Sequence, residues 1–118
     1  MGFGGGMGGN MGKMLMKQME EMQRKMERIQ AELGQERIEA TSGGGMVIAV
    51  ASGLGEMIEI RINPEVVDPD DVEMLQDLVT AAVNEAMTRA HSRREERMGE
   101  VTGGLNVPGM PQLPGMFR

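Results

Sequence analysis

The sequence predicts an α+β fold in which a helix, three antiparallel strands and a second helix follow one another in the order α-β-β-β-α. Three observations predict this fold. A heptad of apolar residues runs through residues 11–33, short apolar stretches separated by glycine turns fill residues 35–63, and a stripe of helical period follows from residue 69. A chain of 118 residues is one domain by its length.

Both ends of the chain are expected to be flexible tails. Residues 1–10 are rich in Gly and Met, and residues 103–118 are rich in Gly, Pro and Met, with Pro-Gly-Met beginning at Pro108 and at Pro114. Such segments bury too little apolar surface to offset the entropy of ordering them. The ordered domain is therefore expected at 11–102. A domain this small would complete its core naturally by oligomerisation.

The first helix is expected at residues 11–33. Its apolar positions recur at spacings of four and three, which is a heptad seam that needs a partner. Methionine at these spacings indicates packing rather than metal or cofactor binding. Gly34 is expected in the left-handed conformation that closes a helix. The seam consists of Leu15, Met19, Met22, Met26, Ile29 and Leu33.

Three strands are expected at 35–42, 46–51 and 57–63. Ile38 and Ala40 share one face of the first strand. Residues 43–45, all glycine, form a hairpin turn. A phosphate-binding loop is excluded there, because no Lys-Ser/Thr follows and the next element is a strand.

The second strand is apolar on both faces, which is typical of a strand buried on both sides. One face can cover the helices. The other face has nothing left to cover it in a chain this short, so a second subunit is expected to do so. We expect the homodimer interface at Met46, Ile48 and Val50.

The third strand alternates regularly. Ile58, Ile60 and Ile62 are expected to point inward, and Glu59 and Arg61 to point outward.

The second helix is expected from Pro69 to about Met98. Asp68 is expected to cap it, and Pro69 suits the first helical position. Capping accounts for the acidic run after residue 67 better than metal binding or catalysis does. The apolar stripe of this helix consists of Val72, Leu75, Val79, Ala82, Ala86 and Ala90.

The net charge is −6, but the charge is unevenly distributed. Residues 38–87 hold one base against ten acids, and both flanking segments are slightly basic. If the two helices pack antiparallel, the beginning of the first and the end of the second meet at a basic tip far from the sheet. Bases placed there can contact the phosphates of double-stranded DNA. The predicted tip consists of Lys13, Lys17, Arg89, Arg93, Arg94 and Arg97.

Direct reading of DNA bases is not expected, because the sequence contains no helix-turn-helix or zinc-finger pattern and no aromatic residue placed for stacking. His91 is the only histidine and there is no cysteine, so neither a usual metal site nor a catalytic triad is predicted. We expect no catalytic residue, no cofactor and no small-molecule substrate. The lack of a signal peptide and of a membrane span fits a soluble cytoplasmic protein.

One alternative from a different class stays open at this point. The methionine-rich seam of the first helix could hold an apolar segment of another protein, as in a protein-interaction or chaperone-like module. Protein partners that stay bound after nuclease treatment would favour that alternative over DNA binding.

Several short motifs follow one another along residues 11–104 in an order that resembles the YbaB/EbfC family of bacterial nucleoid-associated proteins. The motifs are GGG-x-V at 43–47, G-x-G at 53–55, I-x-I-N-P-E at 60–65, D-x-E-x-L-x-D-L at 71–78, A-A-V-N-E-A at 81–86 and M-G-E-V-T-G-G at 98–104.

The resemblance implies the α-β-β-β-α fold and a homodimer joined through the sheets, with paired helices projecting like tweezers. It also implies non-enzymatic binding of double-stranded DNA in the nucleoid, with a role in chromosome organisation and gene regulation. The glycine-rich start and the Pro-Gly-Met tail depart from the shared pattern. Ile48 and Val50 depart as well, since a more polar residue is usual at these two positions.

Overall fold

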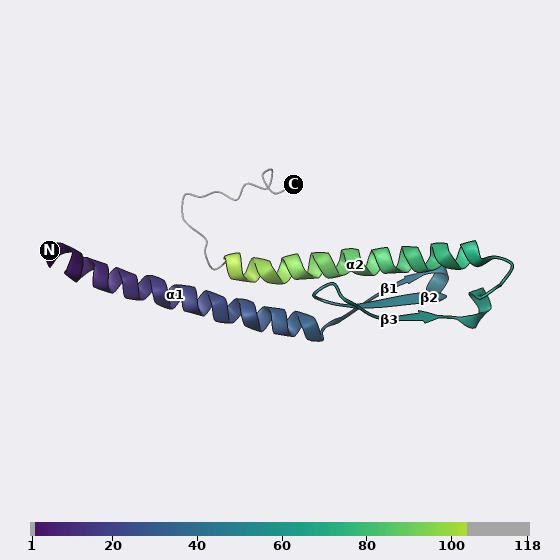
Figure 1. Ribbon diagram of the computed structural model, residues 1–118, viewed down its shortest axis with the longest axis horizontal. Coiled ribbons are helices and arrows are strands. Elements are labelled where there is room, and N and C mark those ends of the chain that lie inside the picture. The colour runs from purple at the N-terminus through teal and green to yellow at the C-terminus, as the bar shows by residue number, and fades with distance from the viewer. Residues whose placement is uncertain (1, 104–118) are drawn as a thin grey trace, which may run out of the picture.

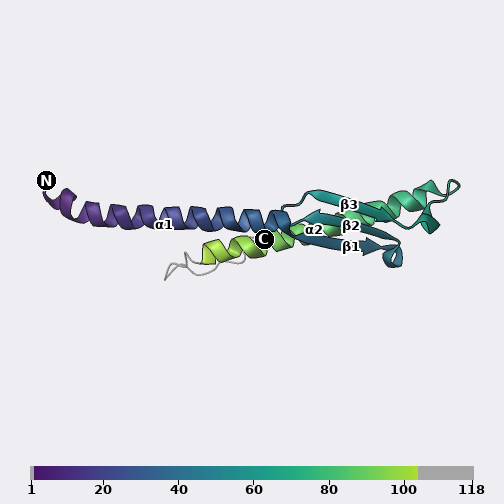
Figure 2. The same cartoon turned by 90° about the horizontal axis from the view of Figure 1, so that it is seen from below.

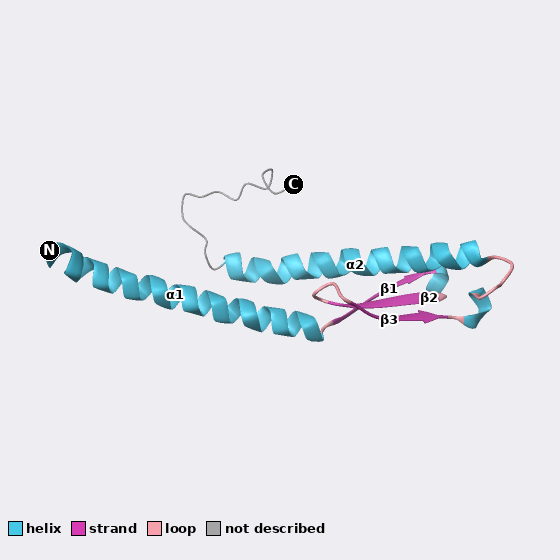
Figure 3. Ribbon diagram, in the orientation of Figure 1, coloured by secondary structure: helices cyan, strands magenta, loops and turns pink. Residues whose placement is uncertain are grey.

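The protein is described by a computed structural model that covers residues 2–103 and the side chains of residues 10–101. Its elements follow the predicted order α-β-β-β-α (Figures 1 and 3). The molecule is extended, with dimensions of 82 × 30 × 18 Å. The elements are α1 (Gly2–Gln35), β1 (Arg37–Ser42), β2 (Val47–Ser52), β3 (Met57–Ile62) and α2 (Val72–Gly103).

The bounds of α1 differ from the prediction at both ends. The helix begins at Gly2 rather than at Met11. Glycine lowers helix propensity, but its backbone N–H and C=O can still make the helical hydrogen bonds, so a glycine-rich start is compatible with a helix. At the other end Gly34 lies inside the helix and is not left-handed, so its predicted role is wrong. The flexibility of the tails stays a prediction, and residues 104–118 lie outside the described residues.

The three strands form one antiparallel sheet in the order β1-β2-β3. Gly43, Gly44 and Gly45 have φ angles of 60°, 68° and 93°, a conformation that side chains rarely adopt, and they make the predicted turn between β1 and β2. Residues directly opposite one another share a face of the sheet. The register places Ala40 opposite Ala49, and Ala49 opposite Ile60.

Helix α2 lies across one face of the sheet and packs on β1 and β2 (Figure 2). Alanine on both sides lets the helix approach the sheet closely. The hydroxyl of Ser42 also donates a hydrogen bond of 2.6 Å to the carbonyl of Leu78 in α2. The fully buried residues of this core are Ala40, Val47, Ala49, Ala51, Ala82, Ala86 and Ala90.

Strand β3 corrects one prediction. The register puts Ile60 and Ile62 on the same face as Ala49 and Val47, which is the face that α2 covers. The helix barely reaches β3, however, so Ile58, Ile60 and Ile62 are 46%, 42% and 39% exposed. The predicted direction is right for Ile60 and Ile62, but the predicted burial of the three isoleucines is wrong.

The opposite face of the sheet is covered by ion pairs within the single chain. Arg37 on β1 bonds to Glu59 on β3 at 3.0 Å, and Arg61 on β3 bonds to Glu39 on β1 at 3.4 Å. Glu39 and Glu59 lie directly on either side of Val50, so both pairs cross the middle strand. Val50 is consequently 0% exposed without a second subunit.

The three residues of the predicted dimer interface therefore do not form one open apolar surface. Ile48 is half-buried on the face with the ion pairs. Met46 precedes β2 and packs against the core under α2 instead. The prediction that Met46 shares a face with Ile48 and Val50 is wrong.

Only the later part of the α1 seam is buried against α2. Ile29 and Leu33 are fully buried against Val101 of α2, with Met22 and Met26 packed beside them. The earlier part of the seam lies beyond the described end of α2 (Figure 1). There Met11, Leu15 and Met19 are 57%, 57% and 67% exposed. We call residues 11–22 the stem.

Candidate nucleic-acid interface

Arg93 of α2 joins the two helices near the sheet. Its guanidinium donates to both carboxylate oxygens of Glu36, at 2.7 and 2.9 Å, and also pairs with Glu96. The hydrogen bond from Arg93, strengthened by the charges of Arg93 and Arg97, holds the pKa of Glu36 below its ordinary value despite partial burial of the carboxylate. The same contacts, with Glu36 first and Glu96 second, raise the pKa of Arg93.

Arg97 lies one helical turn further on and is enclosed by acids. It pairs with Glu32, with Glu36 at 3.4 Å and with Glu100 at 3.1 Å, and its side chain is only 15% exposed. A hydrogen bond to Glu32 is the main cause that raises the pKa of Arg97. The three neighbouring carboxylates offset the positive potential of this guanidinium and so weaken its attraction to a phosphate.

Arg89 and Arg94 bond to the sheet region. Arg89 donates to the backbone carbonyl of Glu39 on β1 at 2.8 Å and pairs with Glu85 at 3.1 Å. Arg94 donates to the carbonyl of Leu54, in the turn between β2 and β3, at 2.8 Å. Arg94 also lies 3.2 Å from Nδ1 of His91.

These contacts contradict the predicted basic tip as a single place in the molecule. The prediction assumed that the helices pair along their whole lengths. In the structure Lys25 of α1 bonds to the carbonyl of Glu100, at 3.2 Å. The end of α2 therefore lies beside the middle of α1, and the earlier residues of α1 extend beyond it. The four arginines therefore lie beside the sheet and the end of α1, and Lys13 and Lys17 lie apart from them on the stem.

Lys13 and Lys17 align instead with two bases that the prediction omitted, Arg24 and Arg28. The spacings are four, seven and four residues. Since successive helical residues advance by roughly 100°, the four side chains fall within an arc of about 60° and along about 22 Å of helix. All four are exposed, and none makes an ion pair or a side-chain hydrogen bond with another described residue. We call these four residues the basic stripe.

The basic stripe lies on the side of α1 opposite the apolar seam. Its mean direction is about 180° from that of Leu15 and Leu33 by the same helical geometry. Glu20 and Glu27 border one edge of the stripe, and Glu21 borders the other, so the stripe is narrow. The heptad spacing that revealed the seam could have revealed the stripe from the sequence, since both repeat every seven residues.

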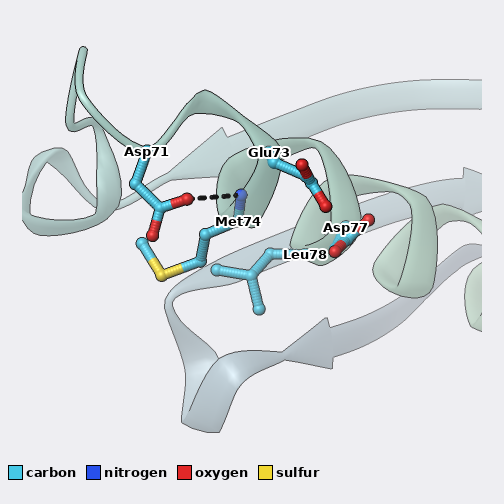
Figure 4. A pocket seen from close by; sticks show the side chains of 5 residues that line it. All are labelled: Asp71, Glu73, Met74, Asp77 and Leu78. Atoms are coloured by element: carbon cyan, nitrogen blue, oxygen red, sulfur yellow. Dashed lines mark hydrogen bonds between the residues drawn. The ribbon is translucent and has the colours of Figure 1, made fainter.

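The beginning of α2 is acidic. Asp71, rather than the predicted Asp68, caps the helix by accepting a hydrogen bond of 3.2 Å from the backbone N–H of Met74 (Figure 4). Asp68 instead accepts from the N–H of Asp70 at 2.9 Å, one turn earlier. Helix α2 continues to Gly103, beyond the predicted end at Met98.

A shallow hollow beside this cap is lined by Asp71, Glu73, Met74, Asp77 and Leu78 (Figure 4). Among the residues with described side chains no group of three or more His, Cys, Asp or Glu is placed to hold a metal ion. No helix in the described part of the chain is long and apolar enough to cross a membrane.

Comparisons with known proteins identify relatives of this chain. The model of the YbaB/EbfC DNA-binding family matches residues 7–105. "Nucleoid-associated protein Teth39_2199" of Thermoanaerobacter pseudethanolicus is 55% identical over 84 residues, which cover 71% of this chain and 76% of that protein. "Nucleoid-associated protein THEYE_A1069" of Thermodesulfovibrio yellowstonii is 56% identical over 80 residues, which cover 68% of this chain and 70% of that protein.

A crystal structure of the uncharacterized protein HP0035 from Helicobacter pylori has a similar fold. The TM-score is 0.57 at 23% sequence identity, and the match covers 66% of this chain and 90% of that chain. The family match at residues 7–105 includes every motif that carried the resemblance. The chain therefore belongs to the YbaB/EbfC DNA-binding family, a family of non-enzymatic nucleoid-associated proteins.

Proposed function

We propose that this protein binds double-stranded DNA in the bacterial nucleoid as a homodimer, with the basic stripe of α1 on the phosphate backbone. The observation that carries the proposal is the alignment of four exposed cations without ion-pair partners among the described residues, on a chain with a net charge of −6. Phosphate contacts supply most of the affinity of sequence-independent DNA binding. Chromosome organisation, with an effect on transcription, is the expected consequence.

The length of the stripe suits one strand of DNA. About 22 Å of helix corresponds to roughly six phosphates at about 3.4 Å of axial rise each. The narrowness of the stripe, with Glu20, Glu21 and Glu27 at its edges, favours contact with a single strand of the duplex. Contacts of this kind position a protein without reading bases.

The experiment measures duplex-DNA affinity across a salt series. Replacing Lys13, Lys17, Arg24 and Arg28 together by Gln should flatten the plot of log affinity against log salt by about 0.9 for each phosphate that the variant no longer neutralises. At low salt the affinity should fall by at least an order of magnitude. Circular dichroism confirms that the variant stays helical.

A matched control separates the basic stripe from net charge. The double variant Arg24→Gln, Arg28→Gln removes two positive charges from α1. The variant Arg37→Gln, Arg61→Gln removes two from the sheet, where both arginines are also about half exposed. The α1 pair should weaken binding several-fold more than the sheet pair. Equal losses would show that binding follows total charge, and would remove the stripe from the mechanism.

For the homodimer, the exposed isoleucine row of β3 supports an interface better than the face around Val50 does. Val50 has no surface left to bury, whereas Ile58, Ile60 and Ile62 are 39–46% exposed on a strand at the edge of the sheet. The other edge strand, β1, already accepts a hydrogen bond from Arg89 at Glu39. An exposed apolar edge strand is a surface on which a second chain readily pairs.

Subunit mass tests this choice of interface. Ile60→Gln should shift the protein toward monomer at a fixed concentration, and Ile48→Gln should leave its mass unchanged. The reverse pattern would restore the interface at Met46, Ile48 and Val50 that the sequence predicted. DNA affinity measured on the same samples shows whether two copies of the basic stripe bind together.

A further inference from the structure

The apolar seam of the stem is left open by the described residues. Met11, Leu15 and Met19 are each more than half exposed, and they continue the line of Met22 and Met26. A heptad seam normally lies against a partner. In the described part of the chain α2 supplies that partner only as far as Val101.

The course of α2 indicates what covers the rest of the seam. Lys25 bonds to the carbonyl of Glu100, and Val101 is 4% exposed beside Ile29 and Leu33. Because α2 runs antiparallel to α1, its last turns point along the stem toward Met11. The last described turn of α2 therefore ends beside the exposed seam, and the axis of α2 points along it.

The sequence after Gly103 has a pattern that fits such a surface. Val107, Met110, Leu113 and Met116 recur at every third residue, and the first three are each followed by proline. A polyproline II helix has three residues per turn and rises about 3.1 Å per residue, so its four apolar side chains would share one edge about 28 Å long. Arg118 is the only charged residue between 104 and 118.

Length and charge agree with this occupant. The seam from Met11 to Met22 is about 17 Å long, which is shorter than the apolar edge that would cover it. The segment carries almost no charge, and the basic stripe lies on the opposite side of α1. We propose that residues 104–118 bind along the apolar seam of their own chain's stem, through Val107, Met110, Leu113 and Met116. This inference does not depend on DNA binding.

Cysteine cross-linking in the full-length protein tests the proposal, because the chain has no cysteine of its own. Leu15→Cys combined with Leu113→Cys should form an intramolecular disulfide under mild oxidation. The matched control is Lys17→Cys with Leu113→Cys, which places the first cysteine on the opposite side of the same helix. We expect the Leu15 pair to cross-link about ten times faster than the Lys17 pair. Equal rates would overturn the proposal.

Two further measurements distinguish the chain's own segment from a second copy of the protein and from a seam that stays open. A mixture of the two single-cysteine variants should give little cross-linking, and efficient cross-linking there would overturn the proposal in favour of a second copy on the seam. Replacing Val107, Met110, Leu113 and Met116 by Ser in the full chain should raise the fluorescence of a bound apolar dye several-fold. The control replaces Leu105, Asn106 and Gln112 by Ser, off the apolar edge. An equal rise in both variants, or no rise in either, would contradict a seated segment.

Discussion

The stem and the body of this molecule, which we take as residues 23–101, contain the same residue types in opposite situations. In the body Arg97 is enclosed by three carboxylates and Leu33 is fully buried. In the stem Lys17 has no ion-pair partner among the described residues, and Leu15 is 57% exposed. These two side chains of the body hold the fold together, whereas these two of the stem are available to bind something else.

The difference has a simple geometrical origin. Helix α1 has 34 residues and α2 has 32, but α2 uses its first half on the sheet. Only the second half of α2 is left to pack against α1, so the two helices overlap along their last turns alone. A cation that faces the other helix within this overlap finds carboxylates. One that lies before the overlap, or on the outer side of α1 as Arg24 and Arg28 do, faces solvent.

The largest effect on stability is expected where the seam is buried. Leu33→Ala should lower the free energy of unfolding by about 2–5 kcal/mol, because it removes a fully buried side chain and leaves a cavity. Met14→Ala is the matched change in the stem, off the seam at 63% exposure, and should alter stability by no more than about 0.5 kcal/mol. Urea unfolding at one protein concentration measures both. Equal losses would mean that the stem is as tightly packed as the body.

A pair of glycines gives a smaller contrast. A Cβ at Gly53 would lie 2.8 Å from the backbone oxygen of Leu33, so Gly53→Ala must push the end of β2 away from α1. Such overpacking costs about 1–3 kcal/mol. At Gly12 a Cβ would meet nothing within 4 Å, so Gly12→Ala should instead stabilise α1 by up to about 1 kcal/mol through helix propensity. Thermal unfolding distinguishes the two, and a loss of stability in Gly12→Ala would show that the stem is not an open helix.

The order of elements and the glycine turn could be predicted from the sequence because they depend on residues close together in the chain. The placement of the cations could not. The contact between Glu36 and Arg93 joins residues 57 apart, and it depends on how far α2 extends past the sheet. The exposure of Ile60 likewise depends on which strands α2 happens to cover.

The basic stripe is different, because it was accessible to sequence reasoning and was missed. Arg24 and Arg28 repeat the spacing of Lys13 and Lys17 after seven residues. The prediction instead selected bases by their distance from the sheet, which required a correct helix pairing. Periodicity within one helix is a safer guide to a shared face than an assumed contact between two helices.

The smallest effect is expected from the carboxylate that links the two helices of the body. Arg93 lowers the pKa of Glu36 in the folded protein below the ordinary value of 4.5. A carboxyl group with a depressed folded pKa contributes stability above its unfolded pKa and loses that contribution as the pH falls through the folded value.

Glu36→Gln should therefore lower stability at pH 7 and reduce the loss of stability on acidification below about pH 4.5. Glu20→Gln in the stem, where no ion pair with a described residue exists, is the matched control and should leave the free energy of unfolding at pH 7 unchanged. Identical profiles for Glu36→Gln and the wild type would show that this ion pair contributes nothing to holding α1 against α2. In that case the joint between the helices would depend on the apolar contact of Ile29 and Leu33 with Val101 and on the bonds of Arg97 to Glu32 and of Lys25 to Glu100.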